Sequence, residues 1–197
     1  DAGGLVSETW DAARIRAEML RPTAGNDLIV GSNLAESLQG DAGDDTLLGG
    51  AGGLFNQVDS FVANAGADTF DGGAGDDLLI GGYAADSYRF GAGGWGHDTV
   101  RDRGGNTTVT DELVFTGLAA ADFTFSRSGD DLLLQRSAVA ADAVRVEGYF
   151  ATDWNWQGAF SRRIERFVFS DATLSHDGVL ARLTQSTEGD DDITGTT

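Results

Sequence analysis

Several residue types that commonly stabilise small domains are missing from this chain of 197 residues. It has no cysteine, which excludes disulfides and thiolate metal sites without fixing the compartment. It has one proline, and all 13 of its basic residues are arginine. No apolar run approaches the ~20 residues of a membrane-spanning helix, and no stretch reads as a signal peptide. With two histidines and no cysteine, nucleophilic catalysis has few candidates, so we expect no enzyme activity.

Acidic residues outnumber basic ones by 32 to 13, which gives a formal net charge of −19. Such a charge repels itself in a compact state and makes nucleic acids poor partners. Disorder alone does not explain the composition, because 41% of residues are hydrophobic and fall at fixed intervals. The acidic residues fall at fixed intervals too, which indicates bound cations.

The chain contains 29 glycines, many of them in one recurring pattern. Residues 72–82 read Gly-Gly-Ala-Gly-Asp-Asp-Leu-Leu-Ile-Gly-Gly, one complete nonapeptide and the start of the next. Glycines permit a sharp turn, the aspartate supplies a hard oxygen ligand, and the last three residues form a short strand with its central residue inward.

With the sixth position as anchor, the pattern recurs at steps of 9, 9, 14, 9, 9, 9 and 12 residues. Two residues after each anchor comes an apolar or aromatic residue that we expect to point inward. The anchors are Asp27, Glu36, Asp45, Asp59, Asp68, Asp77, Asp86 and Asp98, and the inward residues are Ile29, Leu38, Leu47, Phe61, Phe70, Leu79, Tyr88 and Val100.

These nonapeptides resemble the haemolysin-type calcium-binding repeats of RTX proteins. The resemblance implies a parallel β-roll in which two nonapeptides form one coil and several Ca²⁺ ions bind between stacked turns. On regular steps, Asp27, Asp45, Asp68 and Asp86 should share one edge, and Glu36, Asp59, Asp77 and Asp98 the other. An all-oxygen set of carboxylates and backbone carbonyls suits calcium. The expected metal-site residues are Asp27, Glu36, Gly40, Asp45, Gly49, Asp59, Asp68, Gly72, Gly73, Gly75, Asp77, Gly81, Gly82, Asp86, Asp98 and Asp191.

After the repeats, the pattern changes to that of ordinary strands. Residues 88–175 resemble the region that follows the repeats in many RTX proteins. Candidate strands are 113–115, 123–126, 131–135, 143–146 and 164–169, with a hairpin turn at 128–130. Because the open end of a roll exposes strand edges, we expect this region to cap it.

The predicted fold is all-β, with a calcium-stabilised parallel β-roll (β-helix), a capping antiparallel β region and a short N-terminal helix. Four regions are expected: a helix or linker (1–22), the roll (23–105), the cap (106–175), and a linker with the start of a next block (176–197). The last region contains Thr187–Gly195, which has the same phase as Thr23–Gly31, with Asp191 as anchor. Neighbouring RTX blocks are therefore expected as partners, with the module itself a monomer.

The resemblance implies a calcium-binding module of a large secreted bacterial protein, such as a toxin or adhesin. Such modules pass through type I secretion unfolded and fold in extracellular calcium, in the medium or at the cell surface. An alternative is an accessory module that binds acidic polysaccharide for a secreted enzyme such as an alginate epimerase. Arg162, Arg163 and Arg166, beside Trp154 and Trp156, are its candidate residues, although they equally suit a solvated face.

Overall fold

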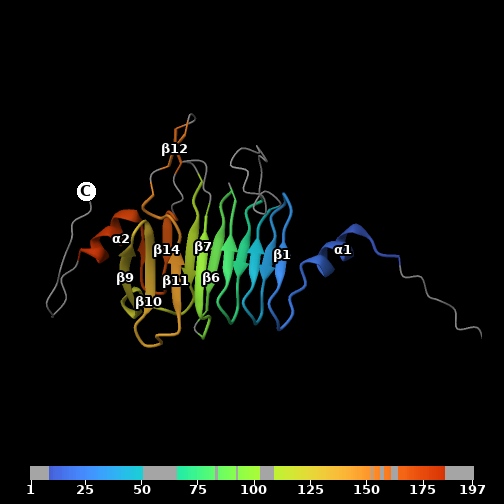
Figure 1. Cartoon of the computed structure of the whole chain (residues 1–197), viewed down its shortest axis with the longest axis horizontal. Helices are drawn as coiled ribbons and strands as arrows, with labels where there is room; N and C mark the ends of the chain where they lie inside the picture. The colour runs from blue at the N-terminus through green and yellow to red at the C-terminus, as the bar shows by residue number, and fades with distance from the viewer. Residues whose placement is uncertain are drawn as a thin grey trace, which may run out of the picture.

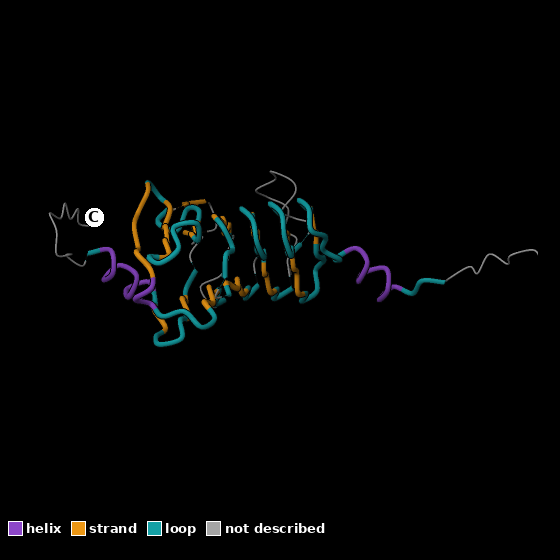
Figure 2. The backbone as a smooth tube through the Cα atoms, turned by 90° about the horizontal axis from the view of Figure 1, so that it is seen from below, coloured by secondary structure: helices purple, strands orange, loops and turns teal. Residues whose placement is uncertain are grey.

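The architecture is a flattened roll of two facing sheets, seen in a computed structural model (Figures 1 and 2). It describes residues 9–50, 66–82, 84–91, 93–102, 109–151, 153–155, 158–160 and 164–184. Successive repeat strands alternate between the two sheets, so each sheet grows by one strand per coil.

The first sheet has seven strands in the order β1-β3-β5-β7-β11-β10-β9. Its pairings are parallel from β1 to β11 and antiparallel from β11 to β9. The strands are β1 (Leu28–Val30), β3 (Thr46–Leu48), β5 (Leu78–Ile80), β7 (His97–Arg101), β11 (Ala143–Val146), β10 (Asp131–Arg136) and β9 (Phe123–Ser128).

The second sheet has six strands in the order β15-β14-β8-β6-β4-β2, parallel from β2 to β14. They are β2 (Ser37–Gln39), β4 (Thr69–Asp71), β6 (Ser87–Phe90), β8 (Glu112–Phe115), β14 (Arg166–Val168) and β15 (Thr173–Leu174). A separate pair consists of β12 (Asp153–Asn155) and β13 (Gly158–Phe160).

The core lies between the sheets and contains one inward column from each. Every predicted inward residue in the described chain is buried, with at most 2% exposure, while Phe61 lies outside the described residues. Strand pairing continues the columns into the cap. The first column is Ile29, Leu47, Leu79, Val100 and Val146, and the second is Leu38, Phe70, Tyr88, Leu113 and Phe167.

The cap extends the roll before it turns antiparallel. Strands β8, β14 and β11 add in parallel to the repeat sheets, and only then does the β9–β10 hairpin close the first sheet. Gly129, at a φ of 62°, provides the predicted hairpin turn. Stacked and tilted rings fill the space behind the roll: Phe90, Phe115, Phe123 and Phe169 have centroids 4.6–5.4 Å apart.

Two short helices lie at opposite ends (Figure 1). Helix α1 (Ala12–Met19) is capped by Asp11, whose side chain accepts the Arg14 N–H, and it buries none of its residues. Helix α2 (His176–Leu183) was not among the predicted elements. Its Val179 is fully buried in the core, so the residues immediately after 175 pack against the cap.

The predicted arrangement of the edges is wrong from the third coil onward. Strand β3 pairs with β5 and β2 with β4, so β4 lies in the second sheet directly after β3 in the first. The regular-step count placed a strand at Phe61, between them, and thereby exchanged the two edges for the four later anchors, Asp68, Asp77, Asp86 and Asp98. Asp59, its anchor, lies outside the described residues.

The cap should be required for the repeats to fold. A chain that ends at residue 105 loses the paired neighbours of β6 and β7 and the aromatic rings that cover Phe90. We expect it to stay disordered at calcium concentrations that fold the full chain, because three-residue strands contribute little core. Circular dichroism during calcium titration compares the two chains. An unchanged calcium midpoint in the shorter chain would mean that the repeats fold without the cap.

Candidate metal sites

One edge of the roll carries a ladder of carboxylates, which we call the first ladder: Asp27, Asp45, Asp77 and Asp98. Asp27, Asp45 and Asp77 each lie at the end of a turn, one residue before a strand, and Asp98 is the second residue of β7. The Asp27 N–H donates to Asp45 Oδ1, Asp45 N–H to Asp77 Oδ1, and Asp77 N–H to Asp98 Oδ1, at 2.8–2.9 Å. Strand pairing sets this spacing, because residues in register on adjacent parallel strands lie within reach of each other.

The opposite edge carries the second ladder: Glu36, Asp68, Asp86, Asp111 and Glu165. Its backbone-to-carboxylate hydrogen bonds repeat the same arrangement at 2.8 Å. Asp111 and Glu165 were missed by the sequence analysis. Each precedes an inward residue by two positions, Leu113 and Phe167, so the short Asp/Glu-x-apolar signal was present without its glycine turn.

Four aspartates on the two ladders have a second carboxylate oxygen without a hydrogen-bond partner among the described residues. Oδ2 of Asp45, Asp68, Asp77 and Asp98 is buried and has no hydrogen-bond partner among the described residues. Burying such an oxygen uncompensated costs several kcal/mol, more when it is charged. These four positions therefore require a positively charged partner or a proton.

At three turns, the absence of a side chain on the first glycine lets that oxygen lie close against the backbone. A Cβ at Gly40 would overlap both Asp45 Oδ2 and the Gly72 carbonyl oxygen of the next turn, and a Cβ at Gly72 would overlap Asp77 Oδ2. At Gly49 a Cβ would overlap Asp68 Oδ2. A carboxylate oxygen therefore lies against each of these glycines, and at Gly40 a carbonyl oxygen lies beside it as well. This set of hard oxygens fits Ca²⁺, which takes six to eight such ligands.

Other glycines are needed for close approach between turns rather than for the ion. Gly73 and Gly75 have φ values of 96° and 146°, and a Cβ on either would collide with the backbone of the preceding turn at Asp41 or Gly43. Gly82 donates its N–H to Asp86 Oδ2 at 2.7 Å.

The ladders differ at their N-terminal ends. The Asp27 carboxylate accepts from the Thr23 N–H at 2.7 Å, and the Glu36 carboxylate accepts from both the N–H and the hydroxyl of Ser32 at 2.6 Å. Arg16 also lies 3.8 Å from Glu36. These first members are already satisfied within their own turns, so we expect Glu36 to hold an ion weakly or not at all.

Three buried aspartates converge near the C-terminal end of the second ladder. Asp86, Asp102 and Asp111 each place a carboxylate oxygen within 4.8 Å of the others, and all are at most 1% exposed. The Tyr88 hydroxyl donates to Asp102 Oδ2 at 2.7 Å, and a Cβ at Gly81 would overlap Asp86 Oδ2. Asp102 occupies the position that glycine holds in earlier turns. Nothing in the repeat pattern signals a ligand there, which is why the sequence analysis missed it.

Burial raises the pKa of the ladder carboxyls. Desolvation, and neighbouring carboxylates after it, raise the pKa of Asp77 to about 6, of Asp68 and Asp111 to about 7, and of Asp98 to about 8. The backbone N–H bond to each carboxylate opposes this without overcoming it. Without a cation, much of the ladder would therefore take up protons near neutral pH.

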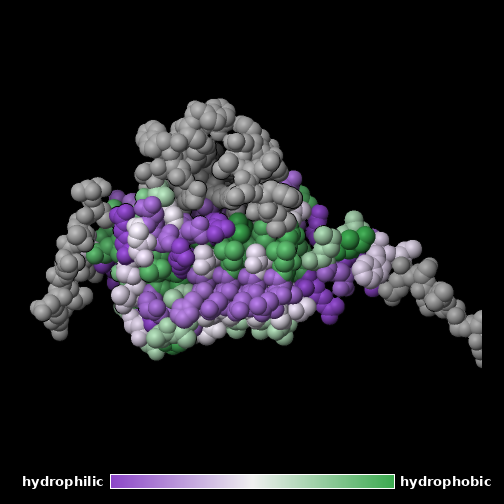
Figure 3. Space-filling model, viewed as in Figure 1, coloured by the Kyte–Doolittle hydropathy of each residue, from purple (hydrophilic) through white to green (hydrophobic). Residues whose placement is uncertain are grey.

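A third row of polar side chains lies exposed beside the first ladder. Asn26 Oδ1 accepts the Asp44 N–H, Asp44 Oδ1 the Asp76 N–H, and Asp76 Oδ1 the His97 N–H, at 2.8–3.0 Å. His97 is thus a turn residue on the surface, 3.6 Å from Asp76. Figure 3 shows hydrophilic side chains in a band along the roll.

The remaining predicted site residues lie outside the described chain or are engaged elsewhere. Asp59 and Asp191, and the side chains of Trp154, Trp156, Arg162 and Arg163, are not described. Arg166 pairs with Glu112 on the adjacent strand at 3.3 Å. No helix in the described ranges is long and apolar enough to cross a membrane.

Comparison with known proteins agrees with this geometry. Residues 30–53 and 56–88 match the family model of the RTX calcium-binding nonapeptide repeat (4 copies). The chain carries RTX calcium-binding repeats. Over 83 residues it is 39% identical to the iron-regulated protein FrpA of Neisseria meningitidis serogroup C, a match that covers 42% of this chain and 6% of that protein.

Two solved structures are also similar. The extracellular lipase LipA from Serratia marcescens is 30% identical, covering 64% of this chain and 18% of the lipase, with a TM-score of 0.43. The AlgE6R3 subunit of the Azotobacter vinelandii mannuronan C5-epimerase is 25% identical, covering 88% and 93%, with a TM-score of 0.44. The roll of this chain is defined by its own strand pairing.

Asp77 should contribute more to calcium-dependent folding than its exposed neighbour Asp76. Asp77→Asn keeps an oxygen for the Asp45 N–H but removes the charge beside Gly72, so we expect the calcium midpoint for folding to rise about tenfold. Asp76→Asn removes the same charge from a residue that also accepts a backbone N–H, yet it should shift the midpoint little. Calcium titrations followed by circular dichroism compare them. Equal shifts would contradict a ligand role for Asp77.

Acidification should stabilise the calcium-free roll. The pKa values of Asp68, Asp77, Asp98 and Asp111 in the folded chain, about 6 to 8, exceed the ~3.9 of an unfolded chain, so the folded state binds more protons. The stabilisation is complete below the unfolded value and is lost as pH rises through the folded ones. We expect more β signal in chelator near pH 5 than near pH 8. A calcium-free chain that is less ordered near pH 5 would refute this.

Proposed function

We propose that this chain is a non-catalytic, calcium-dependent folding module of a larger secreted bacterial protein. It is disordered without calcium, and it folds on calcium binding after export by type I secretion. The observation that carries the proposal is the set of buried, unpartnered Oδ2 atoms on both ladders. The similarity to FrpA and to a lipase described as extracellular supports it.

Electrostatics supports coupling between calcium and folding. Eight aspartates of the described residues are buried, six of them on the two ladders, in a chain with a formal charge of −19. Bringing these carboxylates together without cations raises the free energy of the folded state through desolvation and repulsion. Because the sites exist only once the turns stack, binding energy becomes folding energy.

The calcium affinity typical of extracellular modules would let folding respond to the difference in calcium concentration across the cell envelope. Extracellular calcium modules commonly have dissociation constants of about 10⁻⁴–10⁻³ M. Such a chain stays unfolded in a calcium-poor interior, and an unfolded chain can be threaded through a narrow exporter. Once outside, it meets enough calcium to fold.

The test is a calcium titration of the full chain starting in excess EDTA. We expect little ordered β signal and an expanded hydrodynamic radius in EDTA, with a cooperative gain of β signal at about 0.1–1 mM calcium. Cooperativity is expected because adjacent sites share strands and ladder hydrogen bonds. Magnesium at equal concentration serves as the control cation. A native-like spectrum and compact radius in EDTA would overturn the proposal.

A further inference from the structure

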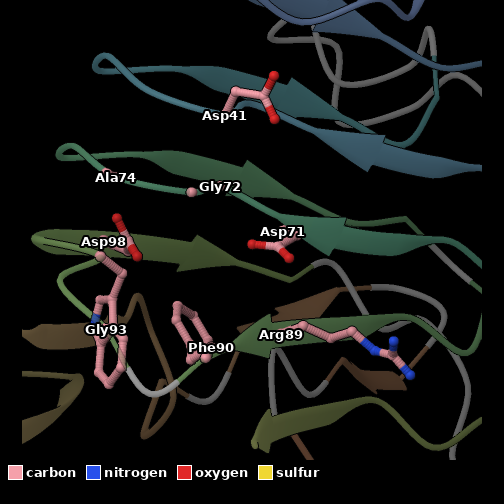
Figure 4. A pocket seen from close by; sticks show the side chains of 11 residues that line it. Asp41, Asp71, Gly72, Ala74, Arg89, Phe90, Gly93 and Asp98 are labelled. Atoms are coloured by element: carbon pink, nitrogen blue, oxygen red, sulfur yellow. The ribbon is translucent and has the colours of Figure 1, made fainter. Parts of the chain in front are cut away.

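Helix α1 and the residue before its cap leave apolar side chains exposed at the N-terminal end of the roll. Trp10, Ile15 and Met19 are 48%, 45% and 68% exposed, and the helix buries none of its residues. Figure 1 shows α1 beyond β1, at the end of the roll away from the cap. The pocket in Figure 4 lies elsewhere, among turns of the roll that include Gly72 and Asp98. Exposed apolar side chains gathered on one short helix indicate an interaction surface.

The chain around α1 corresponds to the chain around α2 at a constant offset of 164 residues. This offset relates Thr23–Gly31 to Thr187–Gly195, which have the same phase. It also relates α1 (Ala12–Met19) to α2 (His176–Leu183) at both ends, since each helix has eight residues. Each helix ends four residues before the threonine of the matching segment.

The N-terminal caps of the two helices correspond as well. The Asp11 side chain accepts the Arg14 N–H. Ser175, at the same offset, accepts the Gly178 N–H, so each cap bonds the residue three positions later. Because caps, lengths and following segments all agree, α1 and α2 are equivalent helices of one repeating unit.

The corresponding apolar positions differ in whether they are covered. In α2, Val179 is fully buried in the core, and Leu174 and Leu183 pack against it. The helix lies against the cap, where it contacts β9 and β15. In α1 the same three positions are exposed. The pairs, with the α1 member first, are Trp10 and Leu174, Ile15 and Val179, and Met19 and Leu183.

We propose that α1 closes the cap of a preceding block and docks there as α2 docks on the cap of this one. The partner is a second calcium-binding block of the same protein, built as a parallel roll with an aromatic β-cap. Ile15 enters that cap at the place that Val179 holds here, with Trp10 and Met19 on either side. The proposal rests on the proposed function only in that it places this module in a larger protein.

Helix α1 also contacts the roll that follows it. Leu20 packs against the core of this roll, and Arg16 lies 3.8 Å from Glu36. These side chains are not the exposed ones, so one helix can contact both neighbours at once. Only three residues separate α1 from Thr23, so the helix also sets the distance between successive blocks.

A graft within the full chain tests whether α1 fits a cap of this kind. Residues 13–20 replace residues 177–184, which keeps Ser175 and His176 and brings Ile15 to the place of Val179. In saturating calcium we expect the graft to melt within about 10 °C of the unmodified chain, because an added methylene overpacks the core only moderately. Hydrogen exchange should show the grafted helix protected. A graft that does not fold, or whose helix is unprotected, overturns the proposal.

Two charge substitutions in the grafted segment separate docking from helix formation. Ile15→Asp there places a carboxylate in the core, so we expect the melting temperature to fall by about 10 °C or more. Ala17→Asp adds the same charge at the place of Ala181, which is exposed, and should change the melting temperature little. Equal effects would contradict docking through Ile15.

The same substitution at its natural place supplies the last control. Ile15 is exposed in the unmodified chain, so Ile15→Asp made there should leave its melting temperature unchanged. A large fall would show that α1 belongs to its own roll, which overturns the proposal.

The proposal and the proposed function fail separately. An unmodified chain that is already folded in EDTA contradicts calcium-dependent folding, and the graft comparison still decides the role of α1. An unmodified chain that folds in calcium beside a graft that does not contradicts the docking of α1 alone. An unmodified chain that does not fold in saturating calcium has no cap for α1 to bind, and both are overturned.

Discussion

The structure depends on how each buried ladder aspartate uses its two oxygens. One accepts the backbone N–H of the equivalent residue in the preceding turn, and at Asp45 and Asp77 the other faces the first glycine of the same turn. The first contact fixes the register of neighbouring coils. The second leaves a buried oxygen whose charge must be compensated. Fold and ion binding are therefore consequences of the same side chain.

The core cannot replace the ions. Each repeat strand of the N-terminal coils is three residues long and contributes a single residue, such as Leu38 or Phe70, to the inward columns. The cap is different, because Phe115, Phe123 and Phe169 pack ring against ring behind the last coil. Hydrophobic burial is thus concentrated at one end, and electrostatic compensation is distributed along the rest.

Much of this arrangement could be predicted from the sequence because the repeat has a period. The anchors and inward residues follow from spacing alone, and the strand at Phe123 and the turn at Gly129 follow from ordinary strand patterns. The pairing of Asp45 with Asp77 could not, because a long step between anchors is compatible with either edge. Asp102 carries no sequence signal, since only the folded chain brings it to Asp86 and Asp111.

The alternation of strands between two sheets restricts how such a chain can change in length. Ladder neighbours are 18 residues apart at Asp27 and Asp45, 32 at Asp45 and Asp77, and 21 at Asp77 and Asp98. Duplicating a single nonapeptide would move every later strand to the opposite sheet as one block, so later aspartates would keep their later neighbours and new pairings would form only across the added repeat. Duplicating two would add one whole coil and leave every later strand in its present sheet. A change in length by whole nonapeptides therefore keeps the ladders, whereas an insertion of another length keeps them only when it lies in a turn.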